Sequence, residues 1–75
     1  GETVPQVGAA SSGLLDLNTA NEAALEELPG IGPVLAGRIV AWRQQHGRFN
    51  SVDELAEVAG IGPAILAQIR DLVRV

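Results

Sequence analysis

Four segments of the chain carry apolar residues three or four positions apart, which places them on one face of a helix. The two longer segments have their apolar positions at Leu35, Ile39, Trp42, Ile65, Ile69 and Leu72. Each longer segment follows a shorter, acidic one, and in the second of these Leu55 and Val58 stand one turn apart. We therefore predict four main helices and no strand.

Capping residues predict where these helices begin and end. Ser51-Val52-Asp53-Glu54 has the pattern of a capping box. For the first helix, Asn21 is one candidate cap, and Thr19, three residues before Glu22, is a rival start two residues earlier. The longer helices open with proline at positions 33 and 63, where the missing N–H costs nothing. Gly47 is the expected end of the first longer helix.

An internal repeat joins these helices in pairs. Leu28-Pro29-Gly30-Ile31-Gly32-Pro33 returns as Val58-Ala59-Gly60-Ile61-Gly62-Pro63. Each copy lies between a short helix and a longer one, so each repeat is a helix, a tight turn and a helix. The expected fold is all-α, with a pseudo-two-fold relation between repeat one at about 17–46 and repeat two at about 51–73. We expect Phe49 to fill the gap between the repeats.

The domain organisation follows from composition along the chain. Residues 1–13 are small and lack periodicity, so we expect a flexible linker or tag remnant there, and the folded domain over 14–75. The first residue is glycine instead of methionine, so we expect a segment excised from a longer protein. No apolar run reaches the roughly 18 residues that a membrane span requires, so we expect no membrane contact by this segment itself.

The two Gly-Ile-Gly turns carry the candidate chemistry. Glycine permits a positive φ, and the isoleucine between the two glycines should point inward and hold the helices together. The N–H groups that follow would then point outward at the positive end of a helix dipole, where they can bind a phosphate without a lysine. The alternative interpretation is a tight helix–helix corner with no ligand.

Charge changes this picture in two ways. The net charge of −4 argues against a general electrostatic attraction to DNA. Between residues 28 and 52, however, there is no acid, and Arg38, Arg43 and Arg48 give that window a charge of +3. All five basic residues are arginine, which suits bidentate phosphate contact. An ordinary solvated surface is the alternative.

Beyond these features, the wider run of residues resembles the C-terminal tandem helix-hairpin-helix domain of ComEA-type competence proteins, a SAM-like fold. The resemblance rests on Leu17-Asn18-Thr19-Ala20-Asn21, the first Gly-Ile-Gly turn, Trp42-Arg43, Gly47-Arg48-Phe49, Ser51-Val52-Asp53-Glu54-Leu55 and the second turn. It covers roughly residues 17–73. Such proteins receive double-stranded DNA outside the cell membrane and deliver it for uptake. The resemblance therefore implies an extracytoplasmic location, an N-terminal tether, and partners among the DNA-uptake machinery.

The resemblance also implies site residues. Main-chain N–H groups of the hairpins and of the next helical turn would hold phosphates, at Gly30, Gly32, Val34, Leu35, Gly60, Gly62, Ala64 and Ile65, with Ile31 and Ile61 at the hairpin centres. Some hairpins hold a Na⁺ or K⁺ ion on main-chain carbonyls, and the matching positions are Glu26, Leu28 and Ile31, with Ala56, Val58 and Ile61 in repeat two. No other cofactor is expected.

Two positions depart from the family pattern. A small residue is usual four positions after the second glycine, where Ala36 fits and Leu66 does not. Basic residues often follow the hairpin, and here the positions after Pro33 and Pro63 are uncharged. These departures predict a different helix crossing in repeat two and a modest affinity.

Side chains outside the turns have weaker assignments. Arg38, one turn beyond the first hairpin, is the first candidate for an auxiliary DNA contact, and Arg48 is the second. Arg43 is expected to pair with an acid of a neighbouring helix, and His46 to act as a cation at a helix C-terminus. Trp42 stands at core spacing, so we expect it to pack instead of stacking on a base.

Three functions remain to be compared. The leading prediction is sequence-independent binding of double-stranded DNA, because hairpin amides contact phosphates and not base edges. The alternative is a protein-interaction module on the same helical scaffold, which the negative charge favours. An enzyme is not expected, because the chain has no lysine for a Schiff base, no cysteine and a single histidine.

Overall fold

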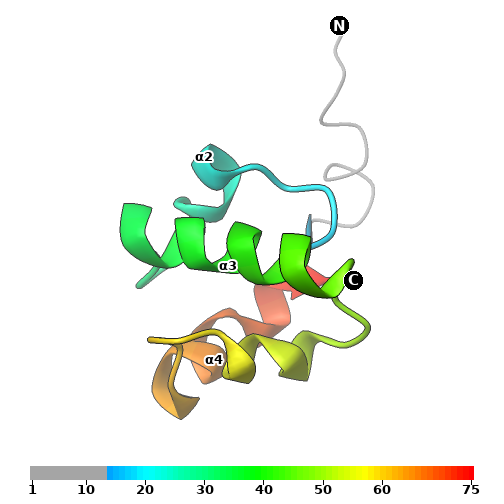
Figure 1. Ribbon diagram of the computed structural model, residues 1–75. Coiled ribbons are helices and arrows are strands. Elements are labelled where there is room, and N and C mark those ends of the chain that lie inside the picture. The colour runs from blue at the N-terminus through cyan, green and yellow to red at the C-terminus, as the bar shows by residue number, and fades with distance from the viewer. Residues whose placement is uncertain (1–13) are drawn as a thin grey trace, which may run out of the picture.

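The computed structural model describes residues 14–75, so the predicted linker at 1–13 lies outside the described residues. The elements in order are β1 (Leu15–Asp16), α2 (Glu22–Leu25), α3 (Pro33–His46), the 3₁₀ helix η1 (Val52–Glu57), α4 (Pro63–Ile69), the 3₁₀ helix η2 (Arg70–Leu72) and β2 (Val73–Arg74). Figure 1 shows α3 crossing the middle of the molecule, with α2 on one side and α4 on the other. The predicted helical fold with two hairpins is confirmed.

The first short helix begins where the repeat register predicts. The side chain of Asn21 accepts a hydrogen bond of 2.9 Å from the amide of Ala24, so Asn21 is the N-cap of α2. The rival start at Thr19 is wrong. The amides of Thr19 and Ala20 both donate to the carbonyl of Asp16. Thr19 is therefore part of a separate turn that precedes α2.

The short helix of the second repeat is η1, a 3₁₀ helix. The carboxylate of Glu54 accepts the amides of Asn50 at 2.6 Å and of Ser51 at 3.4 Å, so the predicted capping box is present. Six residues between a cap and a glycine turn leave room for little more than one helical turn, and short helices often take the tighter 3₁₀ form.

The expectation that the chain contains no strand is wrong for its two ends. Leu15 and Asp16 pair in parallel with Val73 and Arg74, and the amide of Leu17 donates to the carbonyl of Arg74 at 2.8 Å. To reach this pairing the last helix stops being α-helical at Ile69. Leu72, which periodicity placed on the apolar face of that helix, is therefore 41% exposed.

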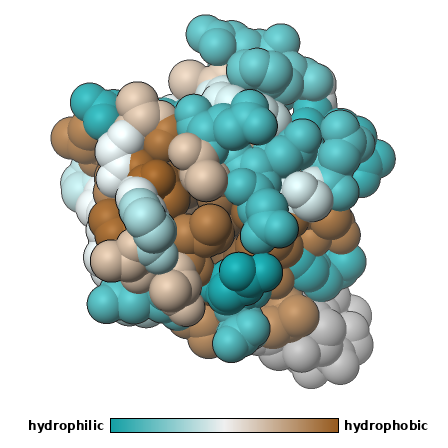
Figure 2. Space-filling view, turned by 90° about the horizontal axis from the view of Figure 1, so that it is seen from below, coloured by the Kyte–Doolittle hydropathy of each residue, from teal (hydrophilic) through white to brown (hydrophobic). Residues whose placement is uncertain are grey.

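One apolar core lies between the two repeats. Ile31 and Ile61 are buried at equivalent positions, as are Leu25 and Leu55. Phe49 is completely buried in the connector and fills the gap as predicted. Seen from below in Figure 2, apolar surface reaches the outside between hydrophilic edges, and Val34 is the most exposed large apolar side chain of the described residues.

The backbone of Phe49 is fixed by a side chain that periodicity did not indicate. The amide of Phe49 donates to Oδ1 of Asn18 at 2.6 Å, and Nδ2 of Asn18 donates to the carbonyl of Phe49 at 3.0 Å. Asn18 precedes α2, so this pair of bonds joins the start of repeat one to the connector before repeat two. Its only signal in the sequence is its place in the run that resembles the ComEA-type domain.

Candidate nucleic-acid interface

The two Gly-Ile-Gly turns have the same backbone geometry. Gly30 and Gly60 have φ values of +83° and +95°, which residues with a side chain rarely adopt. In each turn the amide of the isoleucine donates a hydrogen bond of 3.1 Å to the carbonyl three residues earlier. Ile31 donates to Leu28, and Ile61 donates to Val58. Equal sequences have therefore folded into equal turns, and each one delivers the chain into the first turn of a longer helix.

The amides predicted to hold phosphate have no hydrogen-bond partner within residues 14–75. They are the amides of Gly30, Gly32, Val34 and Leu35 in repeat one, and of Gly60, Gly62, Ala64 and Ile65 in repeat two. The first intrahelical bonds of α3 and α4 begin later, with the amides of Ala36 and Leu66 donating to the carbonyls of Gly32 and Gly62. Each hairpin thus presents a matching set of unpaired donors.

The side chains around these amides differ in exposure. Ile31 and Ile61 are each 4% exposed, so only their main chains could reach a ligand. Leu35 and Ile65 are half-buried between the repeats, whereas Val34 is 65% exposed and Ala64 is exposed. The side chains of the donor residues themselves are therefore all uncharged.

Each hairpin touches the helix that follows the other hairpin. A Cβ placed on Gly60 would lie 2.6 Å from Cδ2 of Leu35 and 2.8 Å from Nη1 of Arg38. A Cβ placed on Gly30 would lie 3.5 Å from Oε1 of Gln68 and 3.9 Å from Cγ1 of Ile65. Because residues 35 and 38 correspond to 65 and 68 in the repeat, the contacts are reciprocal. The two hairpins consequently lie at the same end of the molecule.

This contact predicts a graded series of glycine-to-alanine variants. Gly60→Ala should destabilise by about 2–4 kcal/mol, because it combines a positive φ with contacts that Leu35 and Arg38 must vacate. Gly47→Ala has a φ of +89° but open space, and should cost about 1–2 kcal/mol. Gly37→Ala, inside α3 with nothing within 4 Å, should stabilise by about 0.5–1 kcal/mol.

Chemical denaturation of the four proteins measures the series. From most to least stable, the order should be Gly37→Ala, the parent chain, Gly47→Ala and Gly60→Ala. If Gly60→Ala proved as stable as Gly47→Ala, the contact between the repeats would contribute nothing to the fold.

The structure separates the three arginines of the basic window. Arg38 is exposed on α3 beside the second hairpin, and its Nη1 donates a hydrogen bond of 3.1 Å to the carbonyl of Ala59. Arg48 follows Gly47 at the opposite end of α3, a helix of 14 residues and so about 21 Å long. The structure therefore brings Arg38, but not Arg48, together with the hairpin amides.

The expectation that Arg43 pairs with an acid is wrong. Its Nη1 donates to the carbonyls of Leu17 at 2.9 Å and Ala20 at 2.7 Å. These carbonyls belong to the turn before α2, where the backbone leaves acceptors without helical partners. The acid pairs of the described residues are instead Arg70 with Asp53 and Arg74 with Asp16.

Trp42 has no free ring face for a base. His46 and Phe49 both stack on its indole, with ring centroids 4.0 Å and 4.5 Å away and planes inclined by 14° and 17°. Two rings this close cannot share one face of the indole without overlapping, so they cover opposite faces. His46 also bonds the carbonyl of Trp42 through Nδ1 at 2.9 Å. The packing role expected for Trp42 agrees with this arrangement.

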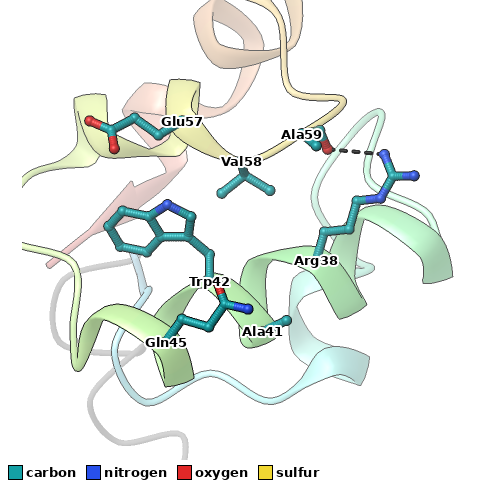
Figure 3. Close-up of a pocket in the computed structure, with 7 residues that line it drawn as sticks. All are labelled: Arg38, Ala41, Trp42, Gln45, Glu57, Val58 and Ala59. Atoms are coloured by element: carbon teal, nitrogen blue, oxygen red, sulfur yellow. Dashed lines mark hydrogen bonds between the residues drawn. The ribbon is translucent and has the colours of Figure 1, made fainter.

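A groove of about 390 Å³ runs beside Trp42 between α3 and the second repeat. Figure 3 shows its lining side chains, with Arg38 at one end, Glu57, Trp42 and Gln45 toward the other, and Val58 between them. The dashed line marks the bond from Arg38 to Ala59. The sequence did not indicate Ala59 or Gln68, although Gln68 could have been found as the repeat equivalent of Arg38.

No group of three or more histidine and acidic side chains within residues 14–75 is arranged to hold a metal ion. None of the helices described combines the length and the apolar character needed to cross a bilayer. At the carbonyls considered for a monovalent cation, that of Leu28 already accepts the amide of Ile31, so one of its lone pairs is in use.

The chain is similar to proteins of several organisms. It is 34% identical to the ComE operon protein 1 of Bacillus subtilis over 83% of the chain, and 42% identical to an uncharacterized protein of Haemophilus influenzae over 79%. It is 43% identical to the endonuclease/exonuclease/phosphatase family domain-containing protein 1 of Xenopus laevis over 75%. The matched part spans 30%, 54% and 10% of these proteins, respectively.

The family assignment rests on the whole folded region. A model of the helix-hairpin-helix motif matches residues 10–74, which include both Gly-Ile-Gly turns and all the helices described above. The chain therefore belongs to the helix-hairpin-helix family.

Proposed function

We propose that this domain binds double-stranded DNA without sequence preference, through the backbone amides of its two hairpins. The observation that carries the proposal is the pair of matching donor sets, none of which is used within the described residues. Backbone N–H groups at the start of a helix suit a phosphate oxygen. A duplex offers phosphates on two strands related by local two-fold axes, and two hairpins related by a pseudo-two-fold could each take one strand.

The biological setting extends the same proposal. The similarity to a ComE operon protein and the resemblance to ComEA-type domains support a role in DNA uptake during natural transformation. In that setting the domain would work outside the cytoplasm, tethered by a preceding segment, and would pass DNA to proteins of the uptake machinery. The domain itself would be non-catalytic, and the endonuclease name belongs to a protein of which the match spans only 10%.

Titration of labelled duplexes at several salt concentrations tests the proposal. We expect duplexes of unrelated sequence to bind with equal affinity, because backbone amides would contact phosphates and not base edges. The plot of log K against log salt should have a slope shallower than about −2, because Arg43 is held by carbonyls and Arg48 lies away from the hairpins. A slope steeper than −4, or a clear sequence preference, would contradict binding through neutral amides.

Two additions to this titration separate the remaining alternatives. Amide chemical shifts should change at residues 30–35 and 60–65 when duplex is added. If the shifts changed elsewhere or not at all, the protein-interaction module would be favoured. The carbonyls of Glu26, Leu28 and Ile31 are the proposed site for Na⁺ or K⁺. Replacing these ions by a bulky organic cation at equal ionic strength should lower the affinity for duplex if the site is used, since a bulky ion could not occupy it.

A further inference from the structure

The reciprocal contact between the repeats is unequal at one position. Arg38 of α3 reaches the second hairpin and donates a hydrogen bond of 3.1 Å to the carbonyl of Ala59. Gln68 of α4 occupies the equivalent place beside the first hairpin, and no hydrogen bond joins it to that hairpin within the described residues. Among residues 14–75, the second hairpin alone is therefore bonded to a charged side chain of the other repeat.

Gly60 leaves room for the Arg38 side chain at the second hairpin. Nη1 of Arg38 lies 2.8 Å from the point where a Cβ of Gly60 would stand, so any residue other than glycine would obstruct the guanidinium. The carbonyl of Ala59 immediately precedes that glycine and accepts the bond. Leu35 packs against the same glycine from one turn earlier on α3. Arg38 and Leu35 thus form a two-point contact on a single turn of backbone.

We propose that Arg38 is a positioning residue, which holds the second hairpin at a fixed place relative to the first, and not a phosphate contact. This inference rests on the proposed function, because the position matters only if both hairpins bind one duplex. A duplex is a rigid ligand whose phosphates have fixed separations. A hairpin that moves relative to its partner must be ordered again on binding, and this ordering weakens the affinity.

The competing role for Arg38 makes a different prediction. A phosphate contact releases counterions, so removing it reduces the slope of log K against log salt by about one. Loss of a positioning bond leaves the slope unchanged and lowers the affinity at every salt concentration. It also loosens the hairpin in the free protein, before any DNA is present. These two consequences distinguish the roles.

The experiment compares Arg38→Gln with Arg48→Gln. Both variants remove one positive charge, but Arg48 lies at the far end of α3. Hydrogen exchange in the free protein then measures the protection of two matched amides. Ile31 and Ile61 each donate a hydrogen bond of 3.1 Å within their own hairpin. In Arg38→Gln, the protection of Ile61 relative to Ile31 should fall severalfold. In Arg48→Gln the ratio should not change. Because the ratio is internal, a uniform loss of stability does not alter it.

The DNA titration completes the test. Arg38→Gln should bind duplex about three- to tenfold more weakly than Arg48→Gln, with the same salt slope, as expected for the loss of one exposed charged hydrogen bond. An unchanged exchange ratio, or a slope reduced by about one, would overturn the positioning role. If the parent chain bound no duplex, the proposed function would fail, while the exchange ratio would still show whether Arg38 holds the hairpin.

Discussion

Gly32→Glu combined with Gly62→Glu should reduce duplex binding by more than 100-fold while the helical content stays nearly constant. Both glycines have extended backbone, with φ values of −98° and −92°, and a Cβ on either would meet nothing within 4 Å. The fold should therefore accept both glutamates. Each carboxylate would lie beside the unpaired amides and repel an approaching phosphate, and like charges brought together in an interface cost several kcal/mol.

Matched controls separate position from net charge. The double variant changes the formal net charge from −4 to −6, because it adds two carboxylates. Gln44→Glu with Gln45→Glu makes the same change on exposed residues near the end of α3 away from the hairpins, and should weaken binding only slightly. Circular dichroism checks the helices and fluorescence titration the affinity. Equal losses in the two double variants would reject the hairpin mechanism.

Phe49→Ala should unfold a large part of the population at 25 °C. Its ring is completely buried and stacks on Trp42 with a centroid distance of 4.5 Å. Removing a buried phenylalanine side chain costs about 3–5 kcal/mol, since the cavity adds to the lost transfer energy. A domain of this size has a total stability of only about 3–9 kcal/mol. One side chain in the connector therefore carries a large share of the stability.

Urea denaturation followed by circular dichroism measures the loss. Val34→Ala is the control, because Val34 is 65% exposed and its truncation should change the free energy of unfolding by less than about 0.5 kcal/mol. Phe49→Leu should fall between the two, since leucine refills much of the space. If Phe49→Ala unfolded at the same urea concentration as the control, the connector would not be part of the core.

The sequence predicted those parts of the fold that depend on local pattern. Helical spacing, the proline at each helix start, the cap at Asn21 and the Glu54 box are all decided within a few residues, and all are present in the structure. The repeat also predicted the equal geometry of Gly30 and Gly60, because the same short sequence joins a short helix to a longer one in each half.

The features that the sequence did not predict depend on contacts distant in the chain. The pairing of Leu15 with Val73 joins residues near opposite ends, and no local pattern marks it. The partners of Arg43 are carbonyls, which every residue possesses, so residue type could not identify them. The bond from Arg38 to Ala59 depends on how the second hairpin packs against α3, and no local pattern determines that packing.

The paired strands β1 and β2 bring the two ends of the described chain together. They lie right of centre in Figure 1, and Leu15 pairs there with Val73 and Asp16 with Arg74. Sequence that precedes the described residues and sequence fused after position 75 would therefore leave the domain from the same place. A fluorescent protein or a surface linker attached at position 75 would, for the same reason, stand beside the start of β1.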